Sequence, residues 1–192
     1  MSSKGRLIVF SSPSGAGKTT LITRLRKDYP ELEFSISATT RTPRGIEKDG
    51  VEYFFLSETE FEEKTKKDEF AEFKTVYGNL YGTLRSFINK SLKEGKNIIF
   101  DVDVQGGLAI KEKYPNDVVM IFIYPPSLED LKERLELRGT DSKETIEKRL
   151  KFAKIEMEKM KEYSYNIENY SVEEAYIELK RILSAEGIIK FK

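Results

Sequence analysis

The sequence predicts an α/β fold in which a parallel sheet is covered by helices on both faces. Apolar segments of strand length alternate with helical segments along most of the chain, which is the pattern of such a sheet. A turn rich in small residues follows the first apolar segment, and two aspartates close a later one at residues 96–103. Both features lie at the carboxyl edge of the predicted sheet, where such folds bind their ligands.

The turn after the first strand, residues 6–10, has the layout of a phosphate-binding loop. Its residues are Ser12, Pro13, Ser14, Gly15, Ala16, Gly17, Lys18, Thr19 and Thr20. Backbone N–H groups and a helix start would converge there on the phosphates of a nucleoside triphosphate. Lys18 would reach the β- and γ-phosphates, and the Thr19 hydroxyl would bind Mg²⁺. Ser12 stands where the strict pattern G-x-x-x-x-G-K-[ST] has its first glycine. The alternative is a β–α turn that binds nothing, which the flanking strand and helix and the Lys-Thr pair disfavour.

The amino-acid composition limits the kinds of binding and catalysis that this chain can perform. The 192 residues suffice for one domain with a sizeable core and a small inserted part. With 33 basic and 33 acidic residues, no overall field favours nucleic acid or a membrane surface. The absence of Cys and His excludes disulfides, Ser-His and Cys-His catalysis and most transition-metal sites. Catalysis must therefore use Lys, Arg, carboxylates, hydroxyls and a hard cation held by oxygen.

No targeting or membrane segment is predicted. No apolar run approaches the ~18 residues of a membrane-spanning helix, and the N-terminus leads into the first strand without a signal-peptide pattern. We therefore expect a cytoplasmic enzyme.

The first half of the chain predicts a helix at residues 20–29, ended by Pro30, and a short strand at 33–37. A polar loop rich in Thr, Arg, Gly and Pro separates it from a strand at 51–56. Ser57 and Glu60 form a capping box that predicts the start of an exposed helix. Residues 71–83 contain Gly78-Asn79 and predict a hairpin. Residues 33–83 are therefore expected to form a β-rich insert with one helix.

The second half alternates more regularly. Helices are predicted at 84–94, with Gly95 at C′, at 105–114, at 127–137 and at 142–162. Ser127 and Asp130 cap the third of these, and Arg138-Gly139-Thr140-Asp141 separates it from the fourth. Buried strands are predicted at 96–103 and 117–124. A weak strand at 165–169 precedes a last helix capped by Ser171 and Glu174.

Asp101 and Asp103 close the strand at 96–103 in the manner of a Walker B motif. Asp101 would hold Mg²⁺ indirectly, opposite Thr19, whereas Asp103 would point elsewhere. The alternative is an ordinary aspartate at a strand end that caps the following helix.

Arginines form a second group, although lysine outnumbers arginine in this chain. Guanidinium forks bind phosphate oxygens in two-pronged fashion and stay charged. Arg134 and Arg138 lie one helical turn apart, and Arg149 would fold over the same phosphates across the Gly139 break. Arg41 and Arg44 occupy the polar loop. The alternative is a set of solvated surface charges.

A third group lies in the β-rich insert and consists of Ser37, Tyr53, Glu72, Tyr81 and Thr83. Hydroxyls and a lone carboxylate there would pair with a purine edge or a phosphate. A glutamate suits guanine, which offers N1–H and a 2-amino group, whereas adenine has no such pair of donors. Tyr and Thr are also simply good strand residues, and composition alone favours that alternative.

Together these residues resemble the guanylate kinases, which are P-loop nucleoside monophosphate kinases. The resemblance rests on SSPSGAGKTTL, SISATTRTPRGIEKDGVEYFF, EFAEFKTVYGNLYGT, FDVDVQG and RLELRGTDSKETIEKRL. It spans residues 7 to about 150 in unbroken order. The arginine motif and the YGNLYGT hairpin are specific to that family.

The resemblance implies the reaction ATP + GMP ⇌ ADP + GDP with Mg²⁺, and it also implies activity with dGMP. It also implies a single domain with a P-loop NTPase-type core at 1–34, 84–126 and 161–192, a GMP-binding insert at 35–83 and a helical lid at 127–160. The core would hold ATP, and the lid would close over the phosphates.

The resemblance also implies roles for individual residues. Arg41, Arg44, Tyr53 and Tyr81 would hold the GMP phosphate, and Ser37, Glu72, Thr83 and Asp103 would read guanine. Lys18, Arg41, Arg134, Arg138 and Arg149 would act in catalysis, with Thr19 and Asp101 around Mg²⁺. The last strand, YSYNIENY, departs from the usual family pattern although Asn169 is kept, so we expect that strand to be short or at an edge.

Two other functions compete with this one. A guanylate-kinase-like module that binds phosphopeptides without catalysis is disfavoured by Lys18, Thr19, Asp101 and the lid arginines. A kinase for AMP or UMP is disfavoured by Glu72, Thr83 and Asp103. The expected partners are ATP and GMP, with no nucleic acid or membrane, and the expected state is a monomer or small homo-oligomer.

Overall fold

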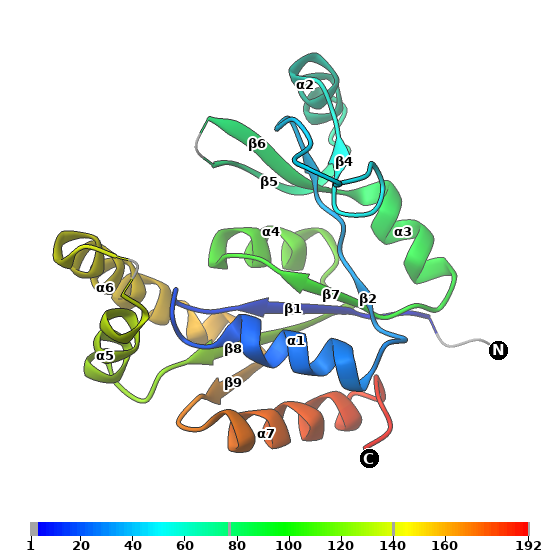
Figure 1. Cartoon of the computed structure of the whole chain (residues 1–192). Coiled ribbons are helices and arrows are strands. Elements are labelled where there is room, and N and C mark those ends of the chain that lie inside the picture. The colour runs from blue at the N-terminus through cyan, green and yellow to red at the C-terminus, as the bar shows by residue number, and fades with distance from the viewer. Residues whose placement is uncertain (1–3, 77, 140, 192) are drawn as a thin grey trace.

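In the computed structural model, residues 4–76, 78–139 and 141–191 are described. Over these residues a five-stranded parallel sheet runs in the order β2-β7-β1-β8-β9 (Figure 1). Its strands are β1 (Leu7–Ser11), β2 (Glu33–Phe34), β7 (Ile98–Asp101), β8 (Val118–Tyr124) and β9 (Tyr165–Glu168). The predicted α/β fold with a helix-covered parallel sheet is confirmed.

Alternating side chains of the central strands supply both layers of the core. Ile8 and Phe10 of β1 pack toward α1 (Lys18–Asp28) and α7 (Val172–Ala185). Leu7 and Val9 pack on the opposite face, toward α3 (Arg85–Lys93) and α4 (Val104–Lys113). Figure 1 shows these helix pairs on the two sides of the sheet. The apolar strands that the sequence contains are therefore buried on both faces, as a parallel sheet requires.

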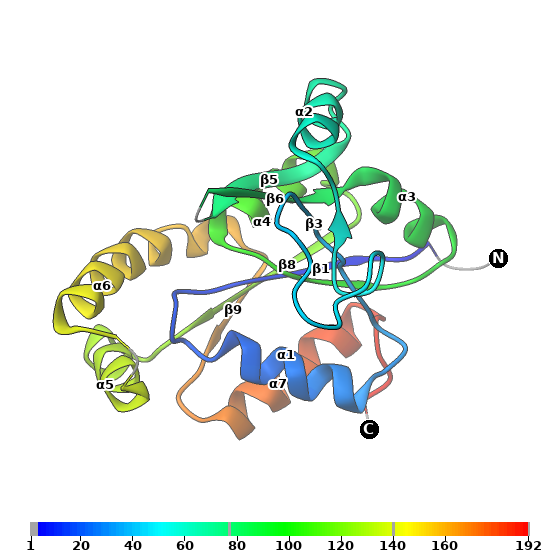
Figure 2. The same ribbon diagram turned by 45° about the horizontal axis from the view of Figure 1, so that its top comes forward.

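A second, four-stranded sheet lies above the first and has its own small core. Its order is β4-β3-β6-β5, and α2 (Glu58–Lys66) packs against it (Figures 1 and 2). The strands are β3 (Ala38–Thr39), β4 (Phe54–Phe55), β5 (Phe70–Val76) and β6 (Asn79–Leu84). The rings of Phe61 and Phe70 stack with centroids 4.2 Å apart. The predicted capping box of Ser57 and Glu60 and the predicted hairpin are both present.

Helices α5 (Leu128–Arg138) and α6 (Lys143–Met157) pack on each other beyond the carboxyl ends of β1 and β8 (Figure 2). Leu131 and Leu135 of α5 meet Ile146 and Ala153 of α6 in a separate apolar cluster. This pair therefore stands at the edge of the sheet where the phosphate loop begins.

Four predicted elements are shorter in the structure. The strand expected at 96–103 spans only Ile98–Asp101, because Asp103 caps α4. The strand expected at 33–37 ends at Phe34, because the chain leaves the core sheet and joins the second sheet at Ala38. The strand expected at 51–56 retains only Phe54 and Phe55, which pair with β3. The helix expected at 142–162 ends at Met157 and is followed by a 3₁₀ turn, η1 (Met160–Glu162). Met157 and Met160 pack beside the buried Tyr163 in the core, which redirects the chain.

The remaining elements follow the sequence closely. β9 has four residues and lies at the sheet edge, as its departure from the family pattern predicted. Gly95 follows α3 with a φ of 75°, which suits its predicted C′ position. Tyr77 of the predicted hairpin and Thr140 of the predicted break lie outside the described residues. In the described part of the chain, no helix is long and apolar enough to cross a membrane.

Candidate nucleotide-binding site

The loop between β1 and α1 has backbone angles that explain its sequence. Gly15 and Gly17 have φ values of 100° and 95°, which favour glycine. Among the described residues, Asp68 is the only non-glycine residue with a positive φ, so Ser12 adopts a conformation that needs no glycine. The missing first glycine of the strict pattern therefore leaves the loop geometry intact.

Asn169, at the end of β9, fixes the loop from the other side. Its buried side-chain amide donates a hydrogen bond of 2.7 Å to the Ala16 carbonyl. A Cβ atom on Gly17 would lie 2.2 Å from that amide nitrogen. Both this contact and the φ of 95° therefore require glycine at position 17. The residue that follows the edge strand thus supports the phosphate loop.

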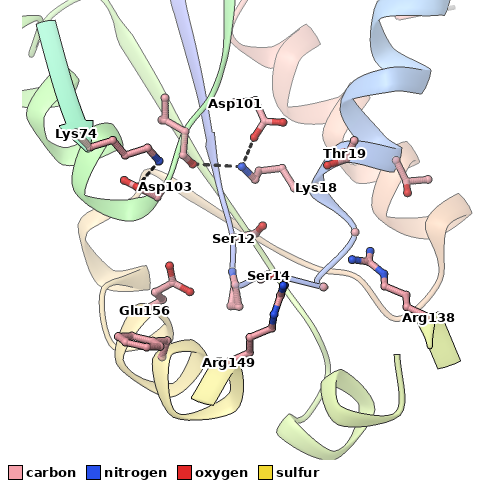
Figure 3. Close-up of a pocket in the computed structure, with 16 residues that line it drawn as sticks. Ser12, Ser14, Lys18, Thr19, Lys74, Asp101, Asp103, Arg138, Arg149 and Glu156 are labelled. Atoms are coloured by element: carbon pink, nitrogen blue, oxygen red, sulfur yellow. Dashed lines mark hydrogen bonds and ion pairs between the residues drawn. The ribbon is translucent and has the colours of Figure 1, made fainter. Parts of the chain in front are cut away.

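A cavity of about 490 Å³ opens beside the loop. It is lined by Ser12, Pro13, Ser14, Gly15, Gly17, Lys18, Thr19, Thr20, Lys74, Asp101, Val102, Asp103, Arg138, Arg149, Phe152 and Glu156. Lys18 contacts the Asp101 carboxylate and the Val102 carbonyl (Figure 3). The structure therefore brings the predicted loop, both aspartates and two of the predicted arginines around one space.

The two arginines reach this cavity from different helices. Arg149 of α6 donates to the Ser14 hydroxyl at 2.5 Å and pairs with Asp141 at 3.2 Å. Arg138 ends α5 and lines the cavity from the other side (Figure 3). Guanidinium groups in these positions suit the oxygens of a triphosphate held by the loop.

Arg134 lies elsewhere, although it is one turn from Arg138. Its guanidinium donates to the Asn169 carbonyl at 2.7 Å and is not among the residues that line the cavity. Arg134 and Arg138 do lie on one face of α5, as the sequence predicted, but only Arg138 lines the cavity. A contact between Arg134 and the transferring phosphoryl group stays a prediction.

A second cavity of about 240 Å³ lies toward the four-stranded sheet. Its lining residues are Phe34, Ser35, Ser37, Glu52, Tyr53, Thr83, Asp101 and Val102. Asp101, the last residue of β7, and Val102, which follows it, line both cavities. Asp101 and Val102 thus form a wall that the two cavities share. The phosphate loop lies on one side of this wall, and three predicted GMP-binding residues lie on the other: Ser37, Tyr53 and Thr83.

Glu72, Thr83 and Asp103 form a polar cluster. The Thr83 hydroxyl donates to Glu72 at 2.7 Å, and a Cβ atom on Gly106 would lie 3.3 Å from Glu72 and 3.4 Å from Asp103. Burial raises the pKa of Glu72, and the nearby Asp103 adds to this effect. Asp103 also accepts from the Gly106 N–H at 2.8 Å and caps α4. The alternative role of a strand-end aspartate, capping the next helix, is therefore correct for Asp103, which belongs to the polar cluster as well.

Arg41, Tyr53 and Tyr81 are close together beside the second cavity, which Tyr53 also lines. The Arg41 guanidinium lies 5.2 Å from the centre of the Tyr53 ring, which is 6.0 Å from that of Tyr81. Arg41 is buried and forms a two-pronged ion pair with Glu47, with both N–O distances 2.9 Å. This pairing raises the pKa of Arg41 and lowers that of Glu47. Arg44 is exposed, and its backbone N–H donates to Glu47 at 2.7 Å.

Sequence reasoning missed Lys74, Glu156 and Glu47. Lys74 and Glu72 are two residues apart on β5, and this strand spacing was a signal that both face the same side. Arg149 and Glu156 are seven residues apart on α6, which places them on one helix face. Burial and the neighbouring Asp103 raise the pKa of Glu156. Glu47 lies in the polar loop, where no periodic pattern indicated its contact with Arg41.

The donor set is suitable for Mg²⁺ bound together with a triphosphate. Thr19 and Asp101 offer oxygens in the phosphate cavity, and Mg²⁺ usually takes one or two protein carboxylates plus phosphates and water. In the described residues, no group of three acidic side chains forms a metal site made of protein alone. Such an ion would therefore depend on the nucleotide for most of its ligands.

Comparison with known proteins gives one consistent result. The family model described as "Guanylate kinase" matches residues 4–186. A guanylate kinase of Myxococcus xanthus is 47% identical over 183 residues, covering 95% of this chain and 87% of the relative. One of Thermotoga maritima is 44% identical, covering 95% and 88%. The crystal structure of guanylate kinase from Anaplasma phagocytophilum superposes with a TM-score of 0.71 at 33% identity, covering 98% and 89% of the two chains.

Proposed function

Because this chain belongs to the guanylate kinase family, we propose that it transfers the γ-phosphoryl group of ATP to GMP, and also to dGMP, in a Mg²⁺-dependent reaction. The observation that carries this proposal is the shared wall between the two cavities, formed by Asp101 and Val102. A triphosphate on the loop and a monophosphate beneath the second sheet would meet at that wall. This arrangement supports direct transfer between two bound nucleotides.

The acceptor side offers groups for both ends of GMP. The Glu72 and Asp103 carboxylates match the N1–H and 2-amino donors of guanine, and the Ser37 and Thr83 hydroxyls supply further polar groups. Arg41, Arg44, Tyr53 and Tyr81 would hold the phosphate. Arg41 is already fixed by Glu47, so its guanidinium loses little freedom when a phosphate binds.

The chemistry needs no general base. The second pKa of a phosphate monoester is about 6, so the acceptor oxygen of GMP is largely ionised at neutral pH. That oxygen attacks the γ-phosphorus of ATP, and the bond from phosphorus to the β,γ-bridging oxygen breaks with its electron pair moving to ADP. Lys18, Arg138 and Arg149 would stabilise the charge on the transferring group.

Thr19 and Asp101 would hold Mg²⁺ beside the phosphates. When bound, Mg²⁺ would neutralise part of the charge on the phosphates. Lys18 contacts Asp101, and we propose that the Lys18 ammonium turns to the phosphates when ATP binds.

The α5–α6 pair would act as a lid, since it presents Arg138 and Arg149 to the phosphate cavity. Its closure would exclude water, which otherwise competes with GMP for the γ-phosphoryl group. The contact of Arg149 with Ser14 supports this role, because it joins the proposed lid to the loop.

The direct test is to identify products after incubation with ATP, GMP and Mg²⁺. We expect ADP and GDP to form in a 1:1 ratio, and EDTA to abolish both. ADP formation that does not depend on GMP would indicate a different reaction. Binding of GMP without any ADP would favour a catalytically silent phosphopeptide-binding module.

A further inference from the structure

Lys74 of β5 reaches from the second sheet to the end of β7. Its ammonium group lies 2.6 Å from the Asp103 Oδ2 atom, and its side chain is 45% exposed. Figure 3 shows Lys74 and Asp103 together, on the side of the cavity away from Arg138. The ion pair therefore connects the proposed guanine-reading carboxylate to the second sheet.

Both oxygens of the Asp103 carboxylate are held. Oδ1 accepts from the Gly106 N–H at 2.8 Å, and Oδ2 binds Lys74. Two separate contacts fix the plane of the carboxylate, while each oxygen keeps a lone pair for a further donor. The orientation of Asp103 thus depends on Lys74 as well as on the start of α4.

Lys74 also offsets a concentration of negative charge. The Glu72 carboxylate lies next to Asp103 at Gly106, and Glu156 of α6 lies on the same side of the cavity (Figure 3). Lys18 contacts Asp101 and Val102 instead. In the described part of the chain, the ion pair found for Asp103 is the one with Lys74.

We propose that Lys74 is a positioning residue for guanine recognition, which holds the Asp103 carboxylate in its orientation beside Glu72 so that both carboxylates accept from the guanine N–H groups. This inference rests on the proposed function. Lys74 acts through Asp103 and does not contact the reacting atoms. Without Lys74, the Gly106 N–H is the hydrogen bond that remains on the Asp103 carboxylate among the described residues, so its Oδ2 atom is no longer held in place for guanine.

The test compares Lys74→Met with wild type and with Lys67→Met, an exposed lysine after α2. We expect the KM for GMP to rise about tenfold in Lys74→Met, as for loss of one charge-assisted hydrogen bond, with kcat and the KM for ATP nearly unchanged. Lys74→Arg should restore most of the affinity.

Guanosine, as a competitive inhibitor against GMP, separates action on the base from action on the phosphate. Its inhibition constant should rise by the same factor as the KM for GMP in Lys74→Met. Unchanged guanosine inhibition, a KM for GMP equal to that of Lys67→Met, or no rescue by Lys74→Arg would each overturn the inference. A wild-type chain that does not phosphorylate GMP would instead refute the proposed function, and this inference with it.

Discussion

The side-chain amide of Asn169 donates a hydrogen bond of 2.7 Å to the backbone carbonyl of Ala16. The two residues are 153 positions apart, and both are buried. Asn169 follows the edge strand β9, whereas Ala16 lies in the phosphate loop. The phosphate loop is therefore stabilised by a distant part of the chain, whose own sequence contains no phosphate-binding pattern.

Gly17→Ala should disrupt this support. The new Cβ would lie 2.2 Å from the Asn169 amide, and its φ of 95° strains any residue with a side chain. We expect the KM for ATP to rise on the order of tenfold or more, because the loop N–H groups lose their arrangement. Steady-state kinetics with varied ATP checks this result.

Gly187→Ala is the matched control, since its φ of 68° imposes strain while nothing lies within 4 Å of its Cβ position. The free energy of unfolding of Gly187→Ala should fall by about 1–2 kcal/mol, and its KM for ATP should stay at the wild-type value. Equal ATP kinetics in the two variants would show that the Asn169 contact does not matter for the loop.

Lys18→Met should abolish most turnover and leave GMP binding intact. Lys18 lines the phosphate cavity, but it is absent from the lining of the cavity with Ser37 and Thr83. We expect kcat to fall about 10²–10³-fold, which is typical for loss of one group that stabilises transition-state charge. Calorimetric titration with GMP should give a dissociation constant within about twofold of wild type.

Lys27→Met, an exposed lysine on the same helix, serves as the control and should retain full turnover. A loss of GMP affinity in Lys18→Met that matches its loss of turnover would contradict the division into donor and acceptor sides.

Glu72→Gln should stabilise the nucleotide-free chain. Burial raises the pKa of Glu72 above its unfolded value, so the ionised form costs stability at neutral pH. Gln keeps an oxygen for the Thr83 hydroxyl without the charge. We expect Tm to rise by about 2–4 °C at pH 7, the shift that 1 kcal/mol gives in a chain of this size. The gain should shrink as the pH falls through the raised pKa of Glu72, and it should disappear well below the unfolded pKa of about 4.3, where Glu72 is protonated in both states.

The same variant should lose its preference for guanine. A neutral amide presents one acceptor oxygen and two N–H donors, which oppose the guanine donors. The ratio of kcat/KM for GMP to that for AMP should fall at least tenfold, the discrimination of one mispaired buried polar group. Glu62→Gln on α2 is exposed and should change neither Tm nor this ratio. An unchanged ratio in Glu72→Gln would remove this residue from guanine recognition.

Arg41→Lys should weaken GMP binding although the positive charge is kept. A lysine does not reproduce the two-pronged pair with Glu47, so its ammonium is no longer fixed toward the acceptor. We expect the KM for GMP to rise about tenfold with an unchanged KM for ATP. Arg181→Lys, on the exposed side of α7, is the control and should behave as wild type. A KM for GMP that stays at the wild-type value would argue against phosphate binding by Arg41.

The sequence predicted the features that depend on neighbouring residues. Ser57 and Glu60 form the expected capping box, and Gly95 takes the expected positive φ after α3. Phosphate-loop residues were recognised from their order, because strand, turn and helix start are continuous in the chain. The alternation of apolar strands and helices was enough to predict the covered parallel sheet.

Contacts between distant parts of the chain set the remaining details. The end of α6 at Met157 depends on packing of Met157 and Met160 in the core, whereas the charged residues that follow are good helix formers. Lys74 reaches Asp103 across 29 positions, and a strand pattern gives only the face of Lys74, not its partner. Arg134 shares a helix face with Arg138 but bonds to the Asn169 carbonyl, a partner that no spacing indicated.

The most direct test of the central claim is an acceptor panel. ADP formation from ATP and Mg²⁺ is measured with GMP, dGMP, AMP, CMP and UMP at equal concentrations, and kcat/KM is determined for each acceptor. The shared wall at Asp101 and Val102 and the Glu72–Thr83–Asp103 cluster predict turnover with GMP and dGMP, and at least 100-fold lower kcat/KM with the others. Turnover with AMP or UMP in the absence of turnover with GMP would contradict the account.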